Sequence, residues 1–224
     1  MSSWNAYTRK LSLLGVLFLG AAAAAPASAV AHDRADGLTH PKARALLAKF
    51  RKIEGLSARY REEKRMALLA APLVSEGTVH YMRPGKLARH QTRPEAVSVV
   101  LTGDRLEMGG GGQRQEVDLR ANPVVRMFVD SFLKVLAGDG PALARVYDVT
   151  YRDGPEGAWA LTLRPKVEPM SRMVERIEVS GRGVVLAAME IVEVGGDTTR
   201  MTFSEVNPRR RYGVAEADRV FRVP

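Results

Sequence analysis

The sequence predicts a mixed α/β (α+β) fold that is mainly antiparallel β: an incomplete, strongly curved β-barrel of about 11 strands, with helices covering its open, concave side. Apolar residues alternate with a period near two over most of the chain after Leu56, as in strands with one wet face. Turn-forming residues separate these segments, and no strand–helix–strand alternation indicates a parallel sheet. A sheet that curls around helices without filling the space between them encloses a cavity.

One helix is expected before the first strand. Pro41 can begin it, because proline is tolerated in the first turn of a helix. The apolar residues that follow recur at helical spacing as far as Phe50, and Gly55 is expected to end the helix.

Six strands are predicted next, from alternation and from turns. Leu56, Ala58 and Tyr60 alternate with polar residues, whereas the charged run at 62–65 is expected to form a solvated hairpin edge. The glycines at 109–112 lack the lysine and serine or threonine of a phosphate-binding loop, so a flexible hairpin tip is expected there. The six strands are expected at residues 56–61, 77–83, 87–93, 97–101, 106–108 and 115–119.

A longer helix interrupts the strands. Asn122 is a good N-cap, Pro123 suits the first helical position, and Gly138 is expected to end the helix. Its broad apolar face consists of Val124, Val125, Phe128, Val129, Phe132, Leu133 and Leu136. After a short helical piece at 141–145, strands are expected at 147–151, 159–163, 176–179, 184–194 and 198–206, and a final short element contains Val220 and Phe221.

The first 29 residues have the pattern of a secretory signal peptide. Arg9 and Lys10 precede an apolar run from Leu11 to Ala25, which ends near the A-x-A site at 27–29. The run is too short and too rich in alanine to favour a membrane span. We therefore expect a signal peptide at 1–29, a flexible start of the mature chain at 30–40, a single domain at 41–224, and a location in the bacterial periplasm.

Composition narrows the function classes. The chain has no cysteine, which excludes disulfides, thiolate chemistry and a lipid anchor on an N-terminal cysteine. The net charge of +9 favours anionic membrane surfaces or acidic partner faces. Nucleic acid is not expected as a partner, because the basic residues are scattered rather than interleaved with aromatics. The run Arg209-Arg210-Arg211 is either a solvated segment or a contact for an anionic membrane or an acidic transporter loop.

The sequence gives little evidence for catalysis, a metal site or a cofactor. Of the four histidines, His32 and His40 lie near the start of the mature chain, and alternation places His80 on the outward face of its strand. No nucleophile, zinc or paired-carboxylate motif occurs, so we expect neither an enzyme nor a metal site nor a cofactor.

Several motifs resemble a known family. The stretch GTVHYMRPGKL from Gly77 to Leu87, with Pro94 and LTGDRL at 101–106 after it, resembles the LolA-type carriers of bacterial outer-membrane lipoproteins. The motifs WALTLRPK at 159–166 and F-x-x-P at 221–224 also resemble that family. The order of all these motifs matches the family's order from about residue 41 to residue 224. One departure is Arg89, where family members often have an aromatic residue. The departures leave the cargo open between lipoprotein, glycolipid and another acyl lipid.

The resemblance implies an incomplete, eleven-stranded barrel with helices that form a lid over an apolar cavity. Such carriers take acylated cargo from an inner-membrane transporter, shield its acyl chains, and deliver it to an outer-membrane acceptor. The related acceptor is lipid-anchored through a cysteine, so the soluble carrier is the closer match. In the family, the arginine of the Arg-Pro pair faces the cavity and holds the lid through hydrogen bonds. That position is Arg83 here.

The alternation of residues along its strand predicts the direction of the Arg83 side chain without reference to the family. Val79 and Tyr81 are the apolar, inward residues of their strand, so Arg83 is also expected to point inward. A buried guanidinium needs acceptors for its five donors, and the carbonyls at the end of a lid helix are a plausible set. Such contacts would form a latch that breaks when cargo enters. The alternative is a strand-end arginine beside Pro84 that extends to solvent.

The function predicted from these observations is a monomeric periplasmic carrier that shields the acyl chains of a lipoprotein or lipid and delivers it from the inner to the outer membrane. The alternatives are a lipid- or lipoprotein-sensing regulator of the same fold and, disfavoured by the missing nucleophile motif, a lipid hydrolase. The eight methionines after Met1 suit either a variable acyl pocket or ordinary core. The predicted cavity lining is Val79, Tyr81, Leu87, Val99, Leu101, Phe128, Phe132, Trp159, Leu161, Met189 and Phe203, with Arg83 as the latch.

Overall fold

The computed structural model describes residues 40–224, apart from the side chains of Pro123, Val124, Met127, Phe128, Ser131 and Phe132. The predicted signal peptide (1–29) and nearly all of the predicted flexible start (30–40) lie outside the described residues.

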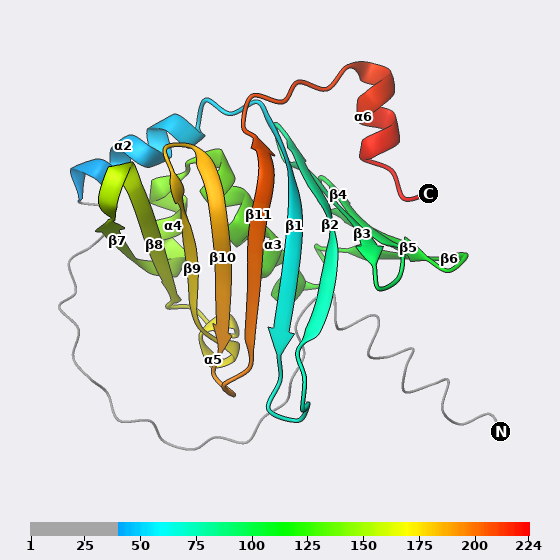
Figure 1. Ribbon diagram of the computed structural model, residues 1–224, viewed down its shortest axis with the longest axis horizontal. Coiled ribbons are helices and arrows are strands. Elements are labelled where there is room, and N and C mark those ends of the chain that lie inside the picture. Colours follow the sequence, from blue (N-terminus) through cyan, green and yellow to red (C-terminus); the bar gives the residue numbers. More distant parts are fainter. Residues whose placement is uncertain (1–39) are drawn as a thin grey trace. The chain divides into compact units, whose positions relative to one another are not determined.

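Eleven antiparallel strands form one open, curved sheet, which confirms the predicted fold class (Figure 1). The strands are β1 (Gly55–Arg65), β2 (Leu73–Met82), β3 (Lys86–Arg93), β4 (Val97–Thr102), β5 (Arg105–Gly110), β6 (Gln113–Asp118), β7 (Tyr147–Asp153), β8 (Ala158–Pro165), β9 (Val174–Arg182), β10 (Val185–Glu193) and β11 (Thr198–Asn207). Their order is β6-β5-β4-β3-β2-β1-β11-β10-β9-β8-β7, so the first and last strands of the chain are neighbours in the middle of the sheet. Two meanders, each made of consecutive hairpins, therefore meet along the β1–β11 pair.

The helices lie on both faces of the sheet. They are α2 (Pro41–Phe50), α3 (Pro123–Ala137), α4 (Gly140–Val146), α5 (Met170–Met173) and α6 (Val214–Val220), with a short 3₁₀ turn at Pro155–Gly157. In Figure 1, α3 and α4 lie behind the sheet, on the side toward which the strands curve. We call this side the inner face. The close approach of α2 and α3 depends on Gly138, where a Cβ atom would lie 2.1 Å from the carbonyl oxygen of Leu47.

The outer face of the sheet carries α6. Phe221 and Val223, at the end of this helix and just beyond it, form a buried cluster with Ala88 of β3 and Val100 of β4. These two strand residues alternate with inward residues of the same strands, so they point to the opposite side of the sheet. Of the predicted final element, Val220 ends α6 and Phe221 follows it, and this part of the chain covers the outer face rather than the concave one.

Three predicted boundaries at the first hairpin are wrong. The charged run at 62–65 was expected at a solvated edge, yet it continues β1 to Arg65, and the side chain of Lys64 is buried. β2 begins at Leu73 rather than at Gly77, because it pairs with this longer β1. Gly55 begins β1 rather than ending the first helix, and a Cβ atom there would lie 2.4 Å from the carbonyl oxygen of Arg210.

Candidate functional site

The inner face of the sheet brings together most of the predicted lining residues. Cross-strand pairs run from Tyr81 to Leu87 and on to Leu101, and from Met189 to Val179 and on to Leu161. Paired residues share a face of a sheet, so each of these rows lies on one side. By this register nine of the predicted residues share the inner face: Val79, Tyr81, Leu87, Val99, Leu101, Trp159, Leu161, Met189 and Phe203. The side chains of Phe128 and Phe132 are outside the described part of α3, so their predicted role stays untested.

Burial divides this face into two kinds of position. Tyr81, Leu101 and Leu161 are fully buried, and Trp159 packs edge-on against Phe50 of α2 with ring centroids 5.8 Å apart. These residues belong to the core between sheet and helices. By contrast, Leu87, Val99, Met189 and Phe203 are only partly buried. The inner face therefore presents apolar side chains that the helices leave incompletely covered.

Helix α3 is held mainly by its neighbours in the helical layer. Its backbone lies close to α2, α4 and α5. At its N-terminal end Arg126 forms an ion pair of 2.6 Å with Asp104 in the β4–β5 turn. Helix α3 is thus joined to α2, α4 and α5 and, through Arg126, to the β4–β5 turn, and its residues Val135 and Leu136 are buried.

Arg83 connects the end of β2 to the end of α2. Its Nε donates to the carbonyl oxygen of Ile53 at 3.1 Å, and its Nη2 donates to the carbonyl oxygen of Arg51 at 2.8 Å. Arg51 is the C-cap of α2, and its own guanidinium donates to the carbonyl oxygen of Gly138, the C-cap of α3, at 3.3 Å. These hydrogen bonds join the sheet to α2 and α2 to α3. They are the contacts that a lid latch needs, while the latch function itself stays a prediction.

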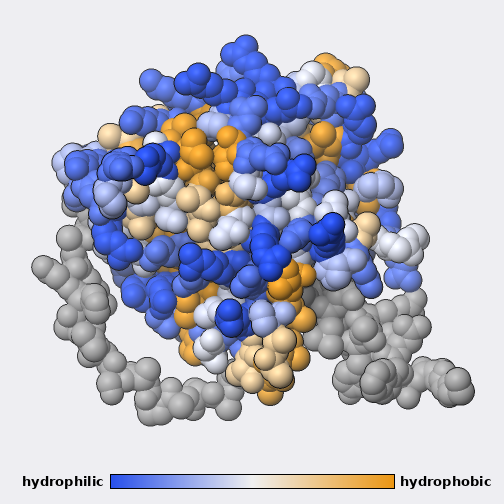
Figure 2. Space-filling model, in the orientation of Figure 1, coloured by the Kyte–Doolittle hydropathy of each residue, from blue (hydrophilic) through white to orange (hydrophobic). Residues whose placement is uncertain are grey.

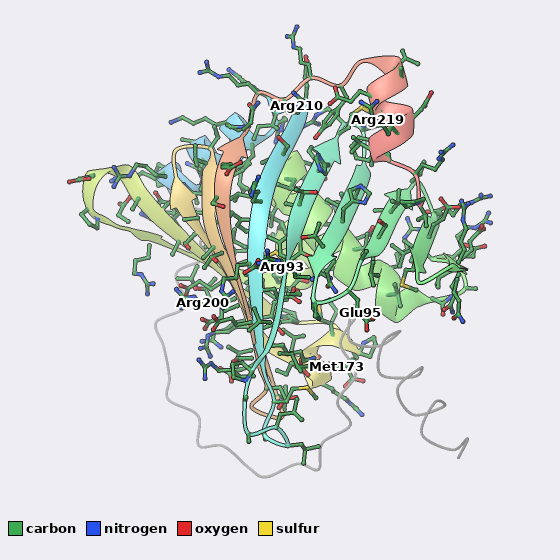
Figure 3. All side chains as sticks on the ribbon, turned by 45° about the vertical axis from the view of Figure 1, so that its right-hand side comes forward. Arg93, Glu95, Met173, Arg200, Arg210 and Arg219 are labelled. Atoms are coloured by element: carbon green, nitrogen blue, oxygen red, sulfur yellow. The ribbon has the colours of Figure 1, made fainter. Side chains whose placement is uncertain are left out.

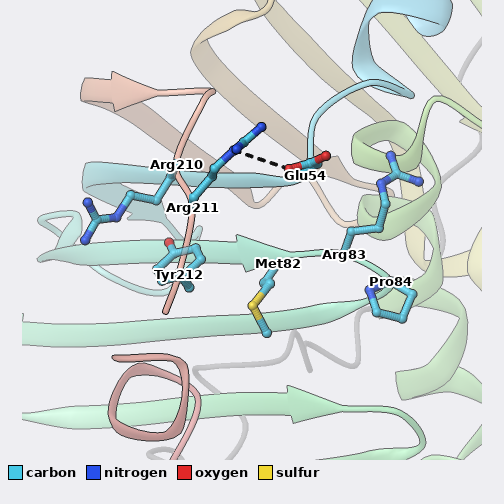
Figure 4. A pocket seen from close by; sticks show the side chains of 7 residues that line it. All are labelled: Glu54, Met82, Arg83, Pro84, Arg210, Arg211 and Tyr212. Carbon is cyan, nitrogen blue, oxygen red and sulfur yellow. Dashed lines mark ion pairs between the residues drawn. The ribbon is translucent and has the colours of Figure 1, made fainter. Parts of the chain in front are cut away.

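A surface pocket of about 550 Å³ lies beside Arg83 (Figure 4). Met82 and Tyr212 contribute its apolar lining, and Glu54 forms an ion pair of 3.5 Å with Arg211 across it. In Figure 4 the guanidinium groups of Arg83 and Arg210 point away from each other. Arg211 is directed toward Glu54, so Arg210 and Arg211 do not converge on one anion site here.

A charged cluster interrupts the apolar inner face. Arg89 forms a 3.1 Å ion pair with Glu62 and donates to the hydroxyl of Ser75 at 3.0 Å. Its guanidinium carbon lies 4.7 Å from the centre of the Tyr60 ring, a distance typical of a cation–π contact. Burial raises the pKa of the Tyr60 hydroxyl, although the charge of Arg89 acts in the opposite direction.

Gly77 makes the reach of Arg89 possible. It lies between Tyr60 and Gln91 in the register, directly in the path from β3 to β1. Without a side chain at this position, the guanidinium of Arg89 can cross β2 to reach Glu62. A Cβ atom at Gly77 would also lie only 2.0 Å from the carbonyl oxygen of His90, so the strands pack too closely for any other residue.

A second buried ion pair lies on the same face, where Lys64 and Glu193 approach to 3.4 Å. Desolvation raises the pKa of the Glu193 carboxyl, and the positive charge of Lys64 partly offsets this rise. Our sequence interpretation missed Glu62, Lys64 and Arg89 as inward residues. The alternation of Leu56, Ala58 and Tyr60, continued by two residues at a time, would have placed Glu62 and Lys64 on the inner face.

The outer face holds its own polar network beneath α6. The hydroxyl of Tyr212 donates to the carbonyl oxygen of Leu56 at 2.8 Å and lies 3.0 Å from Nδ1 of His80. Burial, with the charges of His90 and Arg210, lowers the pKa of His80 to about 4. Nε2 of His90 lies 2.8 Å from the carbonyl oxygen of Val220, and its Nδ1 lies 2.9 Å from the hydroxyl of Ser98. His80 is outward, as predicted, but half-buried.

Two further observations concern the described residues 40–224. No group of three or more His, Cys, Asp or Glu side chains there is arranged to hold a metal ion. No helix in the same range is long and apolar enough to cross a membrane.

Comparisons with known proteins give one family match. A family model described as "Outer membrane lipoprotein carrier protein LolA-like" matches residues 35–210. No curated protein sequence is significantly similar to this chain.

Three solved structures illustrate the structural similarities. A LolA superfamily protein from Nitrosomonas europaea aligns with 11% identity and a TM-score of 0.42, covering 81% of this chain and 97% of its own. The MucA/MucB complex of Pseudomonas aeruginosa aligns with 16% identity and a TM-score of 0.45, and the alignment covers 74% of this chain and 56% of the matched chain. The lipoprotein LppX from Mycobacterium tuberculosis aligns with 11% identity and a TM-score of 0.41, and the alignment covers 78% of this chain and 99% of LppX.

Proposed function

We propose that this chain, which belongs to the family described as outer membrane lipoprotein carrier protein LolA-like, is a non-catalytic carrier that shields the acyl chains of a lipoprotein or lipid on the inner face of its sheet. The observation that carries the proposal is the apolar wall of the inner face, where Leu87 and Val99 on β3 and β4, and Met189 and Phe203 on β10 and β11, are only partly buried. Apolar side chains left partly exposed beneath a helical layer suit a guest that completes their burial.

The energetics suit acyl chains. Each buried methylene contributes about 0.8 kcal/mol, so a single acyl chain supplies ample binding energy. The same energy holds the cargo in a membrane, so a carrier needs a wall of comparable apolarity and a cover that opens at low cost. Helix α3, which lies behind the sheet on its inner side, is the proposed cover (Figure 1). The proposed site of action is the periplasm, between an inner-membrane transporter and an outer-membrane acceptor.

Arg83 is the proposed latch of this cover. Its two hydrogen bonds reach carbonyl oxygens just beyond the C-terminal end of α2, and Arg51 extends the connection to Gly138. Movement of α2 away from the sheet would break these bonds while exposing the inner face. When α2 returns to the sheet after the cargo leaves, the hydrogen bonds of Arg83 form again. Their energy favours the empty state and so helps to expel the cargo.

Native mass spectrometry of the protein purified from the periplasm of its own cells tests the proposal. We expect acylated mass adducts. Phe203→Glu, which puts a charge on the inner face, should abolish them, whereas Thr202→Glu, at the next position of β11 and exposed on the outer face, should not. A lipid-free protein, or adducts that persist equally in both variants, would contradict carriage on this wall. Cleavage of ester substrates would favour the hydrolase alternative.

A further inference from the structure

The turn between β1 and β2 is an apolar projection of the molecule. The segment from Met66 to Leu73 has no charged residue, although charged residues make up 26% of the chain. The exposed fraction of Leu68 is 92%, and those of Leu69 and Leu73 are 43% and 54%. Space-filling colours show this end of the molecule as a tip of apolar surface at the bottom of the view (Figure 2).

Neighbouring turns extend the apolar tip. Val194, in the β10–β11 turn, is 56% exposed, and Val167, before α5, is 41% exposed. The register of β1 with β11 and of β10 with β9 brings all of these turns to the same end of the sheet. Among the described residues, five of the seven large apolar side chains that are exposed thus gather here: Leu68, Leu69, Leu73, Val167 and Val194.

The tip has a fixed shape. The amide of Ala67 donates to Oδ1 of Asp197 in the β10–β11 turn at 3.0 Å, and the amide of Leu69 donates to the carbonyl oxygen of Met66 at 3.0 Å. The amide of Val194 donates to the carbonyl oxygen of Met173, which lies at the same end of the strands (Figure 3). Because these turns are tied to one another, the exposed leucines are already presented before any partner binds, which lowers the entropy cost of contact.

Charges behind the tip favour an anionic surface. Arg65 and Arg200 are 68% and 62% exposed, whereas Glu63 and Glu190, which pair with them, are only 36% and 34% exposed. The cationic ends therefore face outward more than the carboxylates do. Long arginine side chains can extend from the edge of an apolar contact to phosphate groups.

We propose that the β1–β2 turn inserts Leu68 and Leu69 into the acyl layer of a bilayer with anionic headgroups, while Arg65 and Arg200 contact the lipid phosphates. The turn consists of leucine, alanine, methionine and proline, without the tryptophan, tyrosine or arginine that anchor protein–protein contacts, so a lipid surface is the better match. Burying so few side chains gives reversible attachment rather than a permanent anchor. The inference goes beyond cargo binding and does not depend on what the inner face holds.

Because the chain has no cysteine, a single Leu68→Cys substitution permits specific labelling with the polarity-sensitive dye NBD. The probe is a vesicle of phosphatidylethanolamine and phosphatidylglycerol. We expect the dye at position 68 to shift to the blue and brighten when vesicles are added, and to respond less to neutral phosphatidylcholine vesicles. The matched control is Val185→Cys, an exposed apolar position in the strand that follows the β9–β10 turn, where no response is expected.

Vesicle flotation with unlabelled variants supplies the second measurement. Leu68→Glu and Leu69→Glu should each weaken binding about tenfold or more, because full burial of one leucine side chain is worth roughly that factor. Val185→Glu should have no effect, and circular dichroism should show that all the variants fold. Arg65→Gln with Arg200→Gln should remove the preference for anionic lipid.

A dye at position 68 that stays in water, or an equal response at position 185, would overturn the inference. A response to membrane extracts but not to pure lipid would also overturn it, because the partner would then be a protein. None of these results would affect acyl adducts on the inner face. Failure of the membrane-insertion proposal is therefore distinguishable from failure of the carrier proposal.

Discussion

Gly77 and Arg89 show how a single missing side chain shapes the inner face. Arg89 extends across β2 over the gap at Gly77, pairs with Glu62, and lies over the Tyr60 ring. The charged cluster thus stands among the apolar residues of the inner face. Two predictions follow from the packing of these side chains.

Gly77→Ala should destabilise the protein by about 2–3 kcal/mol, because the new Cβ atom would lie 2.0 Å from the carbonyl oxygen of His90 and the backbone must shift. Urea denaturation measures the free energy of unfolding. Gly85→Ala is the matched control, since its nearest neighbour atom would be 4.0 Å away, and it should change stability by less than about 0.5 kcal/mol. Equal losses in the two variants would contradict the role of Gly77 as a close-approach position.

Glu62→Leu should cost about 3 kcal/mol of unfolding free energy, because it leaves the guanidinium of Arg89 largely buried without its carboxylate. Adding Arg89→Leu should restore most of this loss, which a double-mutant cycle measures. The control is the pair formed by Arg61 and Glu76 at 2.7 Å, which is more exposed, and its removal should cost at most about 1 kcal/mol. Additive losses for Glu62 and Arg89 would show that the two side chains are not coupled.

Helices α2 and α3 depend on hydrogen bonds at their C-terminal ends. The last carbonyls of a helix lack partners within the helix, so outside donors can satisfy them. Arg83 supplies donors to the segment that follows α2, and Arg51 supplies one to Gly138 at the end of α3. Two arginines, Arg83 and Arg51, therefore link the sheet to α2 and α2 to α3.

Arg83→Leu should slow the release of bound acyl cargo about tenfold or more, because it removes two charge-assisted hydrogen bonds that favour the closed, empty state. The measurement is the rate at which a fluorescent acyl ligand leaves the protein for acceptor vesicles. Arg93→Leu is the matched control: Arg93 also precedes a proline at the end of a strand, but its side chain is 78% exposed. Unchanged release from the Arg83 variant would remove the latch while leaving the carrier proposal intact.

The molecule as a whole consists of one sheet with unlike faces. The inner face combines an apolar wall with one buried and one partly buried ion pair, and the outer face is covered by α6 over a histidine and tyrosine network. Such buried titratable groups make the stability of the whole domain depend on pH.

The free energy of unfolding should fall as the pH decreases from about 6.5 toward 4. The pKa of His80 is lowered from 6.5 to about 4, so in this range the unfolded state takes up a proton that the folded state does not. The loss should level off below the folded pKa. Thermal unfolding across this range measures the effect, and His80→Gln should flatten the part that His80 contributes. An unchanged slope in that variant would assign the pH dependence to other groups.

Sequence reasoning recovered the strands best where one face is apolar and the other is polar. Alternation placed Val79, Tyr81 and Leu161 on one face, and the structure has eleven antiparallel strands as expected. It failed at 62–65, because charged residues were interpreted as solvated although the partners that neutralise two of them, Arg89 and Glu193, come from distant strands. It also left Phe128 and Phe132 as predictions that the described residues do not test.

What the sequence determined by itself is therefore the local pattern: which segments form strands and helices, and which side of most strands is apolar. Those properties depend on neighbours along the chain, so a short window contains them. Only the tertiary structure decided that β1 pairs with β11, that α6 covers the outer face, and that Arg83 meets the end of α2. These contacts join residues far apart in sequence, and their geometry depends on how the whole sheet curves.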